Sequence, residues 1–253
     1  MAKRPAPDAQ LPLFGEGGHA AGFEVRSSRR ARRLSIHVFP HGRVEVVVPP
    51  RTRVSEVERF VAGHRAWIDR TLASMAATGA AAELALPRRI GFAAVPECWR
   101  VDRRAGPRLR LETHAEPGGG TIRLTAPVRG DGQARRRLRA WVAEQGRRLL
   151  LPRLATLSRE HGLAYRRAGI GRQKTRWGSC TAAGDIRLNC ALLFLPSDLA
   201  DYVIRHELCH LRVLNHSPRF WRQLETIQPR ARALDRRMRE AWSRVPGWLF
   251  YGD

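Results

Sequence analysis

The chain has 253 residues, 43% of them apolar, so it can bury a core as one large domain or two small ones. Its 46 Lys and Arg residues outnumber 23 Asp and Glu, and the resulting net charge of +23 attracts polyanions such as nucleic acid or nucleotides. The chain has no apolar run that could span a bilayer and no apolar segment after its basic start. We therefore expect no membrane segment, no signal peptide and a cytoplasmic location.

The first half of the chain is predicted to be a tail followed by a β-rich region. Residues 1–22 are rich in Pro, Gly and Ala and are predicted to be disordered. Apolar and polar residues alternate within 23–49 on both sides of Pro40-His41-Gly42, which predicts a hairpin. A helix with one apolar face is predicted from Thr52 or Ser55 to about Ala76. Further strands complete a β-rich region with one helix over 23–130, at 88–101, 107–113 and 120–126.

The second half, 131–245, is predicted to be a separate region that begins with a long helix over 133–161, kinked or divided at Pro152. Gly184-Asp185 marks the turn of a second hairpin. The remaining elements are short strands around 167–170, 174–178 and 185–189, a helix that starts near Ser197, and a last helix from Ser217 to about Ser243.

The helix that starts near Ser197 contains the sequence His206-Glu207-Leu208-Cys209-His210. Because a helix repeats every 3.6 residues, the two histidines share a face and can hold one metal ion, with Glu207 as general base. His216 supplies a third ligand and leaves one coordination position for water, as in a catalytic zinc site. Glu225 of the last predicted helix is the competing third ligand, since a carboxylate also completes such sites.

Further sequence blocks surround this motif. They are Arg176-Trp177-Gly178-Ser179-Cys180, Gly184–Asn189, Tyr202–His210, Asn215-His216-Ser217 and Phe220-Trp221, together with Arg29–Leu34 and His64–Ile68 near the start. In combination these blocks resemble the YgjP-like metallopeptidase family, which is related to the SprT-like and WLM zincins. The resemblance covers most of the chain, from about residue 23 to 245.

The resemblance implies an α+β fold, a zincin-like metallopeptidase domain with an N-terminal β-rich and helical extension. In it the helix over 133–161 would back the active-site helix, and the sheet edge at 185–189 would face the cleft. It also implies Zn²⁺ bound by His206, His210 and His216, with Glu207 as base and a peptide or protein as substrate. Such an edge strand pairs with an extended peptide.

The turn that leads to His216 departs from the long zincin motif. Val213 occupies the position where that motif has glycine. The chain must still turn away from the helix, and Asn215 tolerates the left-handed conformation, so we expect Asn215 to supply the bend.

Other residues are candidates for supporting the chemistry. The oxyanion of an acyl-transfer transition state needs a partner besides zinc. The substrate and transition-state candidates are Arg176, Lys174, Arg172 and Tyr202. Asn189 and Ser179 are candidates for orienting a metal ligand.

Three functions remain open at this point. The first is a zinc-dependent metallopeptidase. The second is a metal-dependent hydrolase of nucleotide phosphoanhydrides, in which Lys174 and the arginines near it hold phosphates. The third is a nucleic-acid-associated SprT-like protease or binding module that uses the basic surface. A purely structural zinc is disfavoured, because three histidines and a glutamate form the catalytic set.

Overall fold

The computed structural model describes residues 23–28, 31–38, 44–77, 85–128 and 130–250. The predicted tail at 1–22 and the predicted turn at Pro40-His41-Gly42 lie outside these residues. The fold is α+β, and the chain divides into two compact units, 1–83 and 84–253. Among the described helices, none is both long and apolar enough to cross a membrane.

The first unit is a three-stranded sheet with one helix. Strands β1 (Phe23–Ser27), β2 (Ser35–Val38) and β3 (Val44–Val48) are arranged in the order β1-β3-β2, with β2 antiparallel and β1 parallel to β3. Alternate valines of β3 pack in one buried cluster with apolar residues of α1 (Val54–Ala77), which include Val57, Val61 and Ile68. The predicted hairpin and helix are confirmed, and β1 adds a strand that the hairpin prediction did not separate.

The second unit begins with a four-stranded sheet. Strands β4 (Arg89–Phe92), β5 (Glu97–Ala105), β6 (Arg110–Glu116) and β7 (Gly119–Ala126) follow the order β4-β5-β7-β6. The single strand predicted at 88–101 is two strands, because a turn at 93–96 that includes Pro96 reverses the chain. One face of the sheet is apolar and buried, and the other carries exposed polar side chains.

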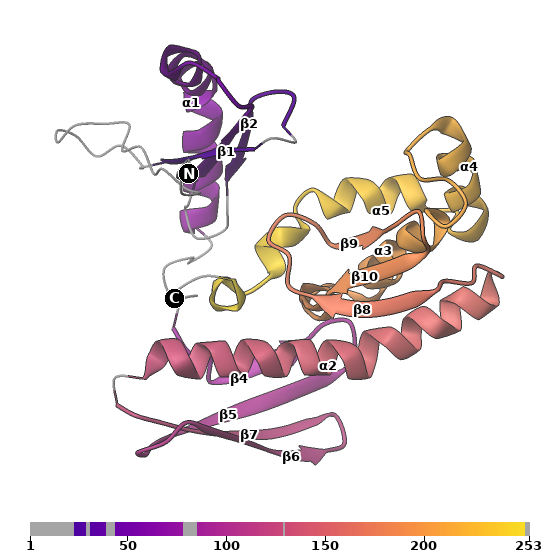
Figure 1. The fold of residues 1–253 in the computed structure, drawn as a ribbon. Helices are drawn as coiled ribbons and strands as arrows, with labels where there is room; N and C mark the ends of the chain where they lie inside the picture. Colours follow the sequence, from indigo (N-terminus) through magenta and orange to yellow (C-terminus); the bar gives the residue numbers. More distant parts are fainter. Residues whose placement is uncertain (1–22, 29–30, 39–43, 78–84, 129, 251–253) are drawn as a thin grey trace, which may run out of the picture. The chain divides into compact units, whose positions relative to one another are not determined.

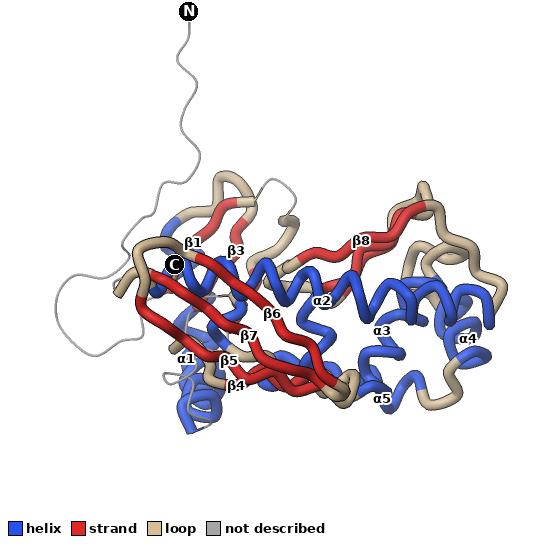
Figure 2. Tube along the Cα trace, turned by 90° about the horizontal axis from the view of Figure 1, so that it is seen from below, coloured by secondary structure: helices blue, strands red, loops and turns tan. Residues whose placement is uncertain are grey.

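Helix α2 (Asp131–Glu160) joins the layers of this unit (Figures 1 and 2). It contacts β7 on one side and β8 and α3 on the other, and Trp99 of β5 meets Trp141 of α2 edge to face at 5.1 Å between ring centroids. Pro152 lies inside the helix without dividing it, and the helix changes direction along its length (Figure 1). The four-stranded sheet of β4 to β7 packs on α2 and so belongs to the same unit. The chain therefore divides near residue 83, whereas the sequence prediction placed the boundary at 130.

The second sheet of this unit carries the strand nearest the histidine motif. It consists of β8 (Arg167–Gly171), β9 (Gly178–Cys180) and β10 (Asp185–Asn189) in the order β8-β10-β9, with β8 parallel and β9 antiparallel to β10. Gly184 makes the turn between β9 and β10 with a φ of 79°. The prediction that 185–189 is the cleft-facing edge is wrong, because β10 is the central strand and β9 is the edge.

The remaining elements are short helices that surround α3. A buried 3-10 turn, η2 (Cys190–Phe194), leads into α3 (Ser197–Cys209), which is followed by α4 (Pro218–Ile227) and α5 (Ala231–Met238). The single last helix predicted over 217–243 is wrong. Pro229 cannot continue a helix and forces an extended conformation on Gln228, whose φ and ψ are −146° and 84°.

The C-terminal segment packs back onto the core of the unit. It contains η3 (Ala241–Arg244) and η4 (Gly247–Leu249). The buried Arg139 of α2 donates from Nε to the Trp248 carbonyl at 2.8 Å, and Arg172 donates to the Leu249 carbonyl at 2.5 Å. Trp242 stacks on Trp177 with 3.9 Å between ring centroids. The segment is therefore anchored both to α2 and to the loop that precedes β9.

Candidate metal centre

Helix α3 places two histidines of the motif side by side at its C-terminal end. Its buried face includes Leu199, Val203 and Leu208, so the helix is fixed in rotation against the core. His206 and His210 are one turn apart on the adjoining face, and their Nε2 atoms are 3.2 Å apart. The helical period of the sequence therefore accounts for the first half of the centre.

His216 reaches the same point from the loop after α3. Its Nε2 lies 2.9 Å from the Nε2 of His206. The expected left-handed bend at Asn215 is wrong, since Arg51 is the one non-glycine residue with positive φ in the described part of the chain. Instead, the Asn215 side chain accepts a hydrogen bond from the Ser217 backbone N–H at 3.3 Å, and this turn brings His216 back over the helix.

The three imidazoles suit a zinc ion. Their ligand atoms all lie within 4.8 Å of one another, and two ligands of a tetrahedral zinc are about 3.3 Å apart. His210 Nδ1 donates to the Val213 carbonyl at 2.9 Å, which directs its Nε2 lone pair to the centre. Burial, together with His210 and His216, lowers the pKa of His206 to about 3, and burial also lowers that of His210. Both rings therefore favour the neutral form that binds metal.

Phe220 of α4 forms an aromatic support beneath the centre. Its side chain is fully buried, and its ring centroid lies 4.9, 4.6 and 4.9 Å from those of His206, His210 and His216. Packing against this ring restricts the orientation of all three imidazoles.

Glu207 lies beside the histidines, and its side chain is almost fully buried. It is 6% exposed, and burial raises its pKa to about 7, although the charge of Arg176 opposes the shift. A carboxyl group with such a pKa can both accept and release a proton near neutral pH. A methyl group built on Gly178 of β9 would lie 2.6 Å from Glu207 Oε1, so the edge strand packs directly on this carboxylate.

These groups open into a cleft of about 390 Å³ between β9 and helices α3 and α5. The free edge of β9 forms one wall, and residues of α3, of the loop after it and of α5 form the rest. Its lining comprises Arg176, Trp177, Gly178, Ser179, Cys180, Tyr202, Val203, His206, Glu207, His210, Leu214, His216, Asp235 and Met238.

The structure brings two of the four predicted substrate-binding residues into the cleft. Arg176 and Tyr202 line it, but the Tyr202 hydroxyl donates to Asp235 at 2.9 Å and is thereby engaged. Arg172 and Lys174 are not among the lining residues, and Arg172 instead holds the Leu249 carbonyl. Their placement in the cleft was wrong because neighbours in a loop need not point to the same side.

The two residues predicted to orient a ligand have other contacts. The buried Asn189 donates from Nδ2 to the Gln173 and Arg176 carbonyls at 2.6 and 2.9 Å and accepts from the Ala191 N–H at 3.0 Å. It thus holds the loop before β9 rather than a histidine. Ser179 pairs with Arg187 of β10, so strand alternation places it on the sheet face opposite to Gly178. The contacts of Asn189 therefore differ from its predicted role, whereas Ser179 lines the cleft and its role stays a prediction.

Replacing Asn189 by alanine is expected to destabilise the protein by about 3 kcal/mol, because it leaves two partly buried carbonyls and one buried N–H without their partner. Urea unfolding measures this loss. Unchanged stability would show that the loop before β9 does not depend on this side chain.

Glu225, the competing third ligand, is placed elsewhere. Its Oε1 accepts from Arg232 Nε at 2.8 Å, and it does not line the cleft. The functional residues that sequence reasoning missed are Gly178, Asp235 and Met238. A signal was available for the first, because a glycine inside the Arg176–Cys180 block suggests a close backbone approach.

The sequence is similar to known metallopeptidases. The profile of the YgjP-like family, a metallopeptidase domain, matches residues 32–241. A crystal structure of the metallopeptidase zymogen abylysin of Pyrococcus abyssi is 28% identical over 34% of this chain and 87% of that one, with a TM-score of 0.31. No curated protein gives a significant match.

Proposed function

The chain belongs to the YgjP-like metallopeptidase family, and from this premise we propose that it is a zinc-dependent peptidase with Glu207 as general base. The observation that carries the proposal is the convergence of three imidazole nitrogens next to one buried carboxyl group with a pKa of about 7. We propose His206, His210 and His216 as the zinc ligands. The substrates of this peptidase would be unfolded segments of cytoplasmic proteins.

The chain's own residues account for the proton transfers of such a reaction. Zinc held by the histidines would acidify its bound water and polarise the scissile carbonyl. Glu207 takes the proton of the attacking water and passes it to the leaving amine. Arg176, which lines the same cleft, is the candidate that stabilises the oxyanion, because its charge already acts on Glu207.

The edge strand supports a peptide as substrate. Among the strands that the structure describes, β9 is paired with β10 alone, so its other edge can add the backbone of an extended polypeptide. Hydrolysis of nucleotide phosphoanhydrides is less well supported. Of the three basic residues proposed to hold phosphates, Arg176 alone lines the cleft, since Lys174 and Arg172 do not.

Metal removal tests the proposal. The purified protein is expected to hold one zinc per chain and to cleave an unfolded protein, to lose the cleavage on chelation, and to regain it when zinc is returned. Metal analysis and gel-based cleavage measure this, with nucleoside triphosphates as the second substrate. Zinc-dependent release of phosphate without peptide cleavage would contradict a peptidase.

A further inference from the structure

Helix α5 borders the cleft, and α4 follows the loop that carries His216, so the arginines of this region lie near the candidate site. Asp235 and Met238 of α5 line the cleft, α4 starts two residues after His216, and both helices contact α3. Within 218–244 eight arginines stand against three acidic residues.

Six of these arginines are exposed and make no ion pair with any residue that the structure describes. We call them the arginine rim, and they are Arg219, Arg222, Arg230, Arg236, Arg239 and Arg244. Of the three carboxylates in 218–244, Glu225 is bound by Arg232 and Asp235 accepts from Tyr202, which leaves the exposed Glu240 against six arginines. The rim therefore presents positive charge that the protein itself does not neutralise.

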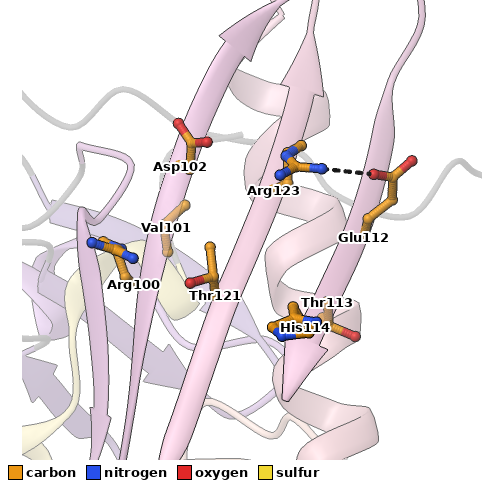
Figure 3. A pocket seen from close by; sticks show the side chains of 8 residues that line it. All are labelled: Arg100, Val101, Asp102, Glu112, Thr113, His114, Thr121 and Arg123. Carbon is orange, nitrogen blue, oxygen red and sulfur yellow. Dashed lines mark ion pairs between the residues drawn. The ribbon is translucent and has the colours of Figure 1, made fainter. Parts of the chain in front are cut away.

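One other hollow of this unit has balanced charges. A hollow of about 700 Å³ on the exposed face of the four-stranded sheet (β4 to β7) contains Arg100 and Arg123 but also Asp102 and Glu112 (Figure 3). Arg123 pairs there with Glu112 at 3.8 Å, and Asp102 pairs with Arg104 at 3.0 Å. Charges in that hollow are balanced, whereas those beside the cleft are not.

The cleft itself does not suit a polyphosphate chain. Trp177, Leu214 and Met238 give it apolar walls, and it holds the carboxyl groups of Glu207 and Asp235. A nucleic acid carries a charge on every unit, whereas a polypeptide can place an apolar side chain in the cleft and carboxylates over the rim.

We propose that the cleft selects polypeptide segments in which a short apolar stretch is flanked by acidic residues, whose carboxylates are bound by the arginine rim. The inference rests on the proposed peptidase function and names the substrate class of the same site. The rim acts on encounter and binding, so it should change KM more than kcat.

Three peptides with one apolar centre and flanks of glutamate, glutamine or lysine test this inference. The zinc-loaded protein should cleave the glutamate peptide with a kcat/KM about tenfold above that of the glutamine peptide, and the lysine peptide more slowly still. The preference should fade between roughly 0.05 and 0.5 M salt. Fluorescence anisotropy on the zinc-loaded Glu207→Gln protein should give the same order of affinities without turnover.

A matched pair of variants locates the effect. Changing Arg222, Arg236 and Arg239 to glutamine should abolish the preference but leave kcat on the glutamine peptide unchanged. The control changes the exposed Arg100, Arg108 and Arg110, which lie in and between β5 and β6, to glutamine. It removes the same amount of positive charge and should preserve the preference.

The outcomes separate the two proposals. Equal kcat/KM on the three peptides, or equal effects of both triple variants on the preference, would overturn the inference. Either result would leave the proposed peptidase function intact. Selective binding of the glutamate peptide without any cleavage would support the rim and contradict the peptidase. Single-stranded DNA that displaces this peptide and binds more tightly, with the same loss in the rim variant, would identify a nucleic-acid site and overturn the inference.

Discussion

Glu207→Gln is expected to lower kcat/KM on an unfolded protein by about a thousandfold while the chain still holds one zinc. Glutamine keeps the shape of the side chain and the packing against Gly178, but it cannot accept the proton of the attacking water. The histidine nitrogens converge without the help of Glu207, so zinc content should not change. Zinc analysis and steady-state kinetics on the same preparation measure both quantities.

Glu225→Gln is the matched control for this change. Glu225 is bound to Arg232 and lies outside the cleft lining, so its amide variant should retain zinc and turnover. Loss of zinc from this control would make Glu225, rather than His216, the third ligand. Normal turnover by zinc-loaded Glu207→Gln would remove Glu207 as the general base.

Gly178→Ala is expected to lower kcat about a hundredfold with little change in zinc content. The added methyl group would lie 2.6 Å from Oε1 and 2.7 Å from Cγ of Glu207, well inside van der Waals contact. Because Glu207 is on a buried helix, its side chain or the short edge strand must shift, and a displacement of about 1 Å can cost a hundredfold in rate. Kinetics and zinc analysis test this, and overpacking should also cost about 1–3 kcal/mol of stability.

Gly169→Ala in β8 of the same sheet is the control. A methyl group on Gly169 would meet no atom within 4 Å, so this variant should behave like the unaltered protein. Equal activity of the two variants would show that β9 can withdraw from Glu207 without consequence.

The histidine motif could be predicted from sequence because its geometry is local. A helix repeat is enough to bring His206 and His210 together, and His216 is only six residues farther on. The α+β class and the family could be predicted from the same blocks. The observed elements confirm the class, and the YgjP-like match over 32–241 confirms the family.

The strand order and the surroundings of the motif could not be predicted, because they depend on contacts between distant residues. The sequence predicted a hairpin of strands around 174–178 and 185–189, and the first of these is 178–180 in the structure. Pairing of 185–189 with β8 is what leaves β9 at the edge. Sequence likewise gave no direction to Arg172, which turns toward Leu249 instead of the cleft. The break at Pro229 was visible in the sequence, and the helical periodicity on both sides of it obscured the signal.

The anchoring of the C-terminal segment bears on how the protein can be shortened or tagged. Trp242 covers Trp177 of the cleft wall, and the backbone around η4 satisfies Arg139 and Arg172. Deleting 241–253 would remove the support of that wall and the Trp248 carbonyl that accepts from the buried Arg139. A chain truncated there would retain every proposed zinc ligand and still lose its active site, so an expression tag belongs at the N-terminal end.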